Sequence, residues 1–136
     1  MNNNFLNIYT DGGSRGNPGP SACAFVVYNS QNEVVFQQGI YIGIGTNNNA
    51  EYLGVLTAYQ RLSSLTQKPD TLHFYLDSEL VVNQLSGLFK IKDPNLYNLS
   101  LQIKEYQKNY SVIYTHIPRS QNSAADLLVN HTLDNR

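Results

Sequence analysis

The chain has 136 residues, of which 41% are hydrophobic and 14% are charged, and its formal net charge at pH 7 is −1. This length predicts one domain over residues 1–136, with a single hydrophobic core. A net charge so close to zero argues against strong, non-specific binding to nucleic acids.

The sequence shows no transmembrane segment, secretory signal or disulfide framework. The longest apolar run, Ala22 to Tyr28, is too short to cross a bilayer, so we expect no membrane association. Residues 1–4 contain neither a basic nor an apolar region of a signal peptide. The single cysteine, Cys23, fits a reducing compartment, and within its apolar run it is expected to be a small buried hydrophobe. We therefore expect a cytoplasmic protein, and a monomer.

Apolar runs rich in β-branched and aromatic residues predict five strands. They are Phe5–Asp11, Ala22–Asn29, Val34–Ile44, Leu72–Leu76 and Val112–Ile117. A turn over residues 30–32 joins the second and third strands into a hairpin. After Thr46, a helix is predicted to run to about Leu65, because apolar residues recur there at helical spacing. The stripe that they form is Tyr52, Val55, Leu56, Tyr59 and Leu62.

Three further helices are predicted in the second half of the chain. One runs through Leu80 to about Gly87, one is opened by Asp93 and Pro94, and the last begins at Asn122. The resulting order, β-β-β-α-β-α-α-β-α, predicts an α/β fold in which helices cover a mixed sheet.

The stretch from Thr10 to Pro20 is the most unusual part of the sequence. It places Asp11 at the end of the first predicted strand and follows it with four glycines. Glycine allows the backbone to turn and to approach a ligand closely. A carboxylate beside exposed backbone N–H groups suits a divalent cation next to a phosphate. The alternative is a plain β-turn between two strands.

Four acidic residues stand where solvent-facing charges are not expected. Asp11 and Asp77 end strands that would be parallel neighbours, where open α/β sheets bind ligands. Glu51 lies at the edge of the buried helical stripe, and Asp126 lies on the apolar side of the last helix. A cap or an edge salt bridge would explain any one of them, but nine Lys and Arg residues are few to pair with all. Converging carboxylates without a Cys or His cluster predict Mg²⁺ or Mn²⁺ rather than zinc.

Four segments, in order along the chain, resemble the motifs of the type 1 ribonuclease H family. They are Asp11–Pro20, Thr46–Glu51, Leu76–Val82 and Pro118–Asp126. The resemblance implies a ribonuclease H-like fold, a five-stranded mixed sheet with helices on both faces. It implies an endonuclease that cleaves the RNA strand of RNA/DNA hybrids and leaves 3′-hydroxyl and 5′-phosphate ends.

The resemblance also implies roles for individual residues. The catalytic, metal-binding carboxylates would be Asp11, Glu51, Asp77 and Asp126, holding two Mg²⁺ or Mn²⁺ ions when the substrate is bound. The contacts to the hybrid would be made by Gly12, Gly13, Asn17, Thr46, Asn47 and Asn48. The Asn and Thr side chains can donate to phosphates and 2′-hydroxyls without reading base identity.

Two features differ from the better-known members of that family. The basic, Trp-containing insert between the middle helices is replaced by residues 87–94, as in the shorter prokaryotic branch. Lys90 and Lys92 in this segment are candidate phosphate contacts, or simply solvated lysines. The loop that often carries a mobile His is also short. We expect His116 to be a half-buried structural residue, and Arg119 is the candidate for assisting at the leaving phosphate.

Two other functions are compatible with the same fold. One is a DNA nuclease, and the other is a non-catalytic module that binds hybrids. The complete set of acids argues against a binding module, because repelling carboxylates do not help to bind a polyanion. The Asn and Thr cluster argues for RNA, whose 2′-hydroxyls such side chains can contact.

Overall fold

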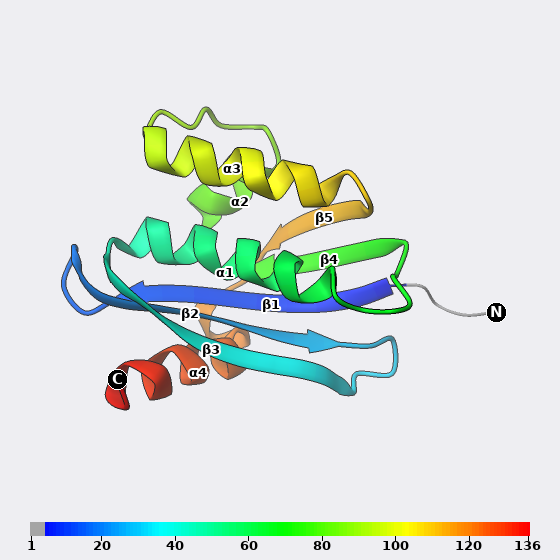
Figure 1. The fold of residues 1–136 in the computed structure, drawn as a ribbon, viewed down its shortest axis with the longest axis horizontal. Helices are drawn as coiled ribbons and strands as arrows, with labels where there is room; N and C mark the ends of the chain where they lie inside the picture. Colours follow the sequence, from blue (N-terminus) through cyan, green and yellow to red (C-terminus); the bar gives the residue numbers. More distant parts are fainter. Residues whose placement is uncertain (1–4) are drawn as a thin grey trace.

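In a computed structural model that describes residues 5–136, the chain forms a five-stranded mixed sheet with helices on both faces (Figure 1). The strands are β1 (Phe5–Ser14), β2 (Gly19–Tyr28), β3 (Val34–Gly45), β4 (Thr71–Leu76) and β5 (Ser111–His116). Their order in the sheet is β3-β2-β1-β4-β5. The hairpin strands β2 and β3 are antiparallel, as are β1 and β2, whereas β4 is parallel to both β1 and β5. The predicted fold class is confirmed.

Four α-helices cover the sheet within residues 5–136. They are α1 (Asn47–Leu62), α2 (Glu79–Leu85), α3 (Pro94–Gln107) and α4 (Ser123–Asp134). Helices α1, α2 and α3 lie on one side of the sheet and α4 lies on the other (Figure 1). The side chain of Asp93 caps α3 by accepting the N–H groups of Asn95 and Leu96 at 2.8 and 3.1 Å. In this part of the chain, no helix has the length and apolar character needed to cross a membrane.

Helix α1 builds the main core. All members of its predicted stripe are buried, and they pack against inward-facing side chains of the sheet, including Ile8, Phe25 and Phe74. The helix ends at Leu62 rather than near Leu65, because the N–H groups of Ser64 and Leu65 bond to carbonyls only three residues back. Such bonds close a turn and do not continue an α-helix.

The predicted end of the first strand is wrong. Strand β1 continues past Asp11 to Ser14, because β2 pairs with it in antiparallel register as far as Ser14 and Ser21. Gly12 and Gly13 are therefore strand residues, and the loop between β1 and β2 is reduced to residues 15–18. The high glycine content suggests a loop, but Gly12 instead serves close packing within the sheet and helix.

The contact between β1 and α1 depends on Gly12. A Cβ atom at this position would lie 2.2 Å from the carbonyl carbon of Ala50 and 2.5 Å from the backbone nitrogen of Glu51. These are backbone atoms, which cannot move without moving the helix. The missing side chain thus lets the first turn of α1 lie directly on β1. Gly13 differs, since a Cβ there would meet a Val129 methyl group at an ordinary 3.7 Å.

We expect Gly12→Ala to destabilise the protein, because α1 must move away from β1 to admit the methyl group. The free energy of unfolding should fall by about 1–3 kcal/mol, as in other overpacked sites. Gly13→Ala is the matched control and should change it by less than about 0.5 kcal/mol. Urea unfolding followed by circular dichroism measures both. Equal effects of the two substitutions would contradict the proposed importance of this contact.

Candidate active site

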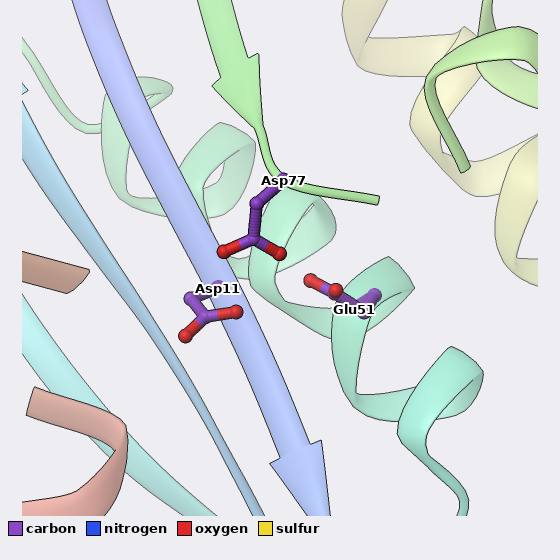
Figure 2. A group of neighbouring side chains, drawn as sticks. All are labelled: Asp11, Glu51 and Asp77. Atoms are coloured by element: carbon purple, nitrogen blue, oxygen red, sulfur yellow. The ribbon is translucent and has the colours of Figure 1, made fainter. Parts of the chain in front are cut away.

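The carboxylates of Asp11, Glu51 and Asp77 point toward one another (Figure 2). One oxygen from each lies within 4.8 Å of the other two. Asp11 is in β1, Glu51 is in the first turn of α1, and Asp77 directly follows β4. The parallel pairing of β1 with β4 ends at Tyr9 and Tyr75, so Asp11 and Asp77 both stand two residues beyond the last pair. They occupy the carboxyl end of parallel strands, the predicted location.

Two of these acids are buried, and burial changes their protonation. Asp11 is 6% exposed and Glu51 is 8% exposed. Burial raises the pKa of Asp11 to about 8, and the negative charge of Asp77 adds to the effect. Burial likewise raises the pKa of Glu51 well above its usual value, with the charge of Asp11 as the second cause. Hydrogen bonding from the Gly12 backbone lowers both pKa values but does not reverse the shift. Without a cation, burial therefore favours the protonated form of both acids, and Asp11 holds a proton near neutral pH.

The arrangement fits a divalent cation. Among the described residues, the buried Glu51 Oε1 has no hydrogen-bond partner, whereas buried polar atoms are normally paired. All three groups offer carboxylate oxygens, the hard ligands preferred by Mg²⁺ and Mn²⁺. A bound cation would contact the unpaired oxygen and neutralise the repulsion between the acids.

Asp126, the fourth predicted acid, lies beside this cluster but is not one of its three members. It is in the first turn of α4, and its side chain interacts with that of Asp11. Its Oδ1 accepts a hydrogen bond of 3.4 Å from Nη2 of Arg119. The three clustered acids line a groove with a volume of about 390 Å³. The lining of this groove also includes Asp126, Arg119, Gly12 and Gly13.

The predicted polar contact residues border a second pocket. This pocket has a volume of about 570 Å³, and its lining includes Asn17, Thr46, Asn47 and Asn48. Asn17 Oδ1 accepts the Asn47 N–H at 2.9 Å, and Asn47 Oδ1 accepts the Ser14 N–H at 2.9 Å. Thr46 Oγ1 caps α1 by accepting the Asn49 N–H at 3.1 Å. In the described part of the chain, neither Asn17 Nδ2 nor Asn47 Nδ2 donates to another residue.

The two predicted lysine contacts lie outside both pockets. Lys90 and Lys92 are exposed in the segment between α2 and α3, and neither is among the residues that line the groove or the polar pocket. Asp93, at the end of this segment, and Asn95, in the first turn of α3, do form part of the lining of the polar pocket. A phosphate contact by either lysine stays a prediction.

The expectation for His116 is wrong in one respect. The residue was expected to be half-buried, but it is exposed. It is the last residue of β5, where the pairing with β4 ends at Leu76 and the chain leaves the sheet. A position at the end of a strand run cannot be distinguished from the strand interior by composition.

Two residues of the site, Asn122 and Asn130, were missed. Asn122 was interpreted only as the start of the last helix, but it is buried and its Nδ2 donates to Asp77 Oδ2 at 3.1 Å. Asn130, in α4, lines the groove and was also not singled out. An asparagine before a helix is normally explained by capping, so nothing in the local sequence indicates a contact with Asp77.

Comparison with known proteins gives matches over nearly the whole chain. A family model described as reverse transcriptase-like matches residues 9–132. Ribonuclease HI of Halobacterium salinarum is 35% identical over 130 residues, which make up 95% of this chain and 64% of that protein. A bifunctional protein of Mycobacterium tuberculosis is 37% identical over 129 residues, or 93% of this chain and 35% of that protein. The chain therefore spans less than two thirds of the length of these curated relatives.

Solved structures share the fold. The crystal structure of RNase H1 from the halophilic archaeon Halobacterium salinarum has a TM-score of 0.91 and 34% identity, and the match covers 97% of this chain and 99% of that chain. LC11-RNase H1, solved in complex with an RNA/DNA hybrid, has a TM-score of 0.90 and 34% identity, covering 96% and 97% of the two chains. The similarity thus extends over the elements that carry the four acids.

We expect Asp11→Asn to stabilise the metal-free protein at pH 8. The substitution keeps the side-chain shape but removes a charge from a buried acidic cluster. The pKa of Asp11 is raised in the folded protein and ordinary in the unfolded chain, so the parent loses stability as pH rises from about 4 toward 8. The variant avoids this loss, and its melting temperature in EDTA should be about 3–6 °C higher at pH 8. The gain should shrink at pH 5. No gain at pH 8, or a larger gain at pH 5, would contradict this account.

Proposed function

This chain belongs to the type 1 ribonuclease H family, and from this we propose that it is an endonuclease that hydrolyses the RNA strand of RNA/DNA hybrids. The observation that carries the proposal is the meeting of Asp11, Glu51 and Asp77 at a groove. Carboxylates repel phosphates, so a protein that only bound nucleic acid would gain nothing from this cluster. A relative of the same family solved with an RNA/DNA hybrid supports the substrate class.

In the proposed mechanism, the four acids hold two divalent cations, Mg²⁺ or Mn²⁺. Ions held by these residues would supply activation of a water molecule and stabilisation of the leaving 3′ oxygen, which would give 3′-hydroxyl and 5′-phosphate ends. Asp11 interacts electrostatically with Glu51, Asp77 and Asp126, which supports it as the ligand shared by both ions. Asp126 stands at the edge of the cluster, which supports a role at one ion only.

The polar pocket is the proposed binding site for the backbone of the hybrid. The Nδ2 groups of Asn17 and Asn47 can donate to 2′-hydroxyls or phosphates while their Oδ1 atoms hold the protein backbone. Thr46 keeps its hydroxyl hydrogen for a phosphate while its oxygen caps α1. Asn48, exposed on the rim of the pocket, supplies a further amide. Contacts of this kind recognise sugar and shape, and they require no particular base.

Charged and glycine residues complete the proposed substrate surface. The side chain of Arg119 is 80% exposed and borders the groove, so its guanidinium can contact the leaving phosphate while paired with Asp126. Gly12 and Gly13 expose backbone along the groove. Contacts with more distant phosphates of the DNA strand are assigned to Lys90 and Lys92, the two exposed lysines between α2 and α3.

We also propose that the protein acts as a monomer in the cytoplasm. Every proposed ligand and substrate contact comes from one chain, so the site needs no second copy. Cys23 is buried, and burial raises the pKa of its thiol to about 11, which keeps it in the unreactive thiol form. A lone, protected cysteine is compatible with a reducing compartment.

The proposal is tested by incubating the protein with a labelled RNA/DNA hybrid, duplex DNA, duplex RNA and single-stranded RNA, each with Mg²⁺, Mn²⁺ or EDTA. We expect cleavage of RNA in the hybrid, and only with a metal ion. Glu51→Gln should reduce the rate by more than about 100-fold, and Asp126→Asn by roughly 10-fold. Glu105→Gln makes the same chemical change at an exposed position of α3 and should stay within about twofold of the parent rate.

Each alternative function has its own outcome in this assay. Cleavage of duplex DNA as fast as of the hybrid would indicate a DNA nuclease of the same fold. Retention of the hybrid in a gel without cleavage under any metal would indicate a binding module. A fully active Glu51→Gln variant would contradict the assignment of the metal site.

A further inference from the structure

Asn122 is a buried amide between the two strands that carry Asp11 and Asp77. It is 1% exposed, and its Nδ2 donates to the Thr10 carbonyl oxygen at 2.8 Å and to Asp77 Oδ2 at 3.1 Å. Thr10 is the residue immediately before Asp11. A single NH₂ group therefore connects the backbone beside one proposed metal ligand with the carboxylate of another.

The sheet alone does not hold these two ligands together. The pairing between β1 and β4 ends at Tyr9 and Tyr75, before either acid is reached. The carbonyl of Leu76 accepts the N–H of Ile117, on the side of β5. The Thr10 carbonyl lies past the last β1–β4 pair, and it accepts from Asn122 instead of from β4. The amide thus bridges the two strands at the point where their own hydrogen bonds stop.

Two observations indicate that the burial of the Asn122 side chain is not explained by a contribution to the stability of α4. Asn122 occupies the N-cap position of α4, but its side chain makes no capping hydrogen bond. Within residues 5–136, its Oδ1 is buried without a partner, which lowers stability. The hydrogen bonds that its side chain does make in this region go to Thr10 and Asp77.

We propose that Asn122 is a positioning residue for the metal site, which fixes the orientation of the Asp77 carboxylate and its separation from Asp11. The inference rests on the proposed function of the site. Side chains that donate to metal-ligating carboxylates restrict their rotation, so less freedom is lost when the cation binds. Without this donor, the Asp77 carboxylate rotates more freely, and the hydrogen-bonded link between Thr10 and Asp77 is lost. The cation therefore binds more weakly.

The test measures Mn²⁺ binding without substrate, by electron paramagnetic resonance of the free ion at pH 8 and well below every melting temperature. Asn122→Ala removes the amide. Asn122→Ser is a second variant in case the first does not fold, because serine is favoured at an N-cap while its hydroxyl is too short to bridge Thr10 and Asp77. Both should bind Mn²⁺ on the order of tenfold more weakly than the parent protein.

Asn29→Ala is the matched control. Asn29 Oδ1 accepts the N–H groups of Gln31 and Glu33 at 2.9 and 3.0 Å, in the turn between β2 and β3. This turn lies at the opposite end of the sheet from the acids, since β2 runs antiparallel to β1. The control loses an equally well-bonded amide and should lose stability, but its Mn²⁺ affinity should stay within about twofold of the parent value.

Parental Mn²⁺ affinity in the Asn122 variants, or an equal loss in Asn29→Ala, would overturn the inference. So would a parent protein that binds no Mn²⁺. A parent protein that binds Mn²⁺ and shows the expected pattern of variants, but does not cleave hybrids, would refute the proposed function and leave the positioning role of Asn122 standing.

Discussion

The site depends on the direct contact of α1 with β1, which Gly12 permits. Because no side chain separates the two backbones, Glu51 in the first turn of α1 reaches Asp11 in β1 and Asp77 directly after β4. The same packing removes water from Glu51 and Asp11, so their charged forms are disfavoured. A buried acidic cluster of this kind lowers the stability of the metal-free protein. The raised proton affinity of Asp11 and Glu51 and the affinity of the site for a cation have the same physical origin, which is the cost of burying their negative charges.

The carboxylate groove and the polar pocket are mechanically linked. Asn47, at the start of α1, lines both of them. Its backbone N–H is held by Asn17 of the loop between β1 and β2, and its side chain holds the N–H of Ser14 at the end of β1. A nucleic acid bound in the polar pocket, as proposed, would therefore lie at a fixed distance from the acids. Under the proposed function, this connection would allow uncharged side chains to position the substrate in a protein whose net charge is −1.

The sequence predicted those features that depend on local periodicity and composition, and it failed where contacts are distant. The buried stripe of α1 follows from its spacing, and the acids stand out because they interrupt apolar patterns. Gly12 was attributed to a loop, because its role depends on Ala50, which approaches only in the folded chain. Asn122 contacts residues 112 and 45 positions away, so no local pattern reveals it. His116 is exposed as the last residue of β5, and where its pairing with β4 ends is not encoded in composition.

A cation that binds at this site is expected to displace protons from the buried carboxylates. Isothermal titration calorimetry with Mg²⁺ or Mn²⁺ at pH 7, repeated in buffers of different ionisation enthalpy, counts the protons released when the ion binds. The pKa of Asp11 is raised to about 8, so this acid carries a proton in most molecules at pH 7 before the ion arrives, and the raised pKa of Glu51 acts in the same direction. The account predicts release of about one proton or more per protein molecule, decreasing as the pH is raised above 8. Tight binding at pH 7 with no proton release would contradict it.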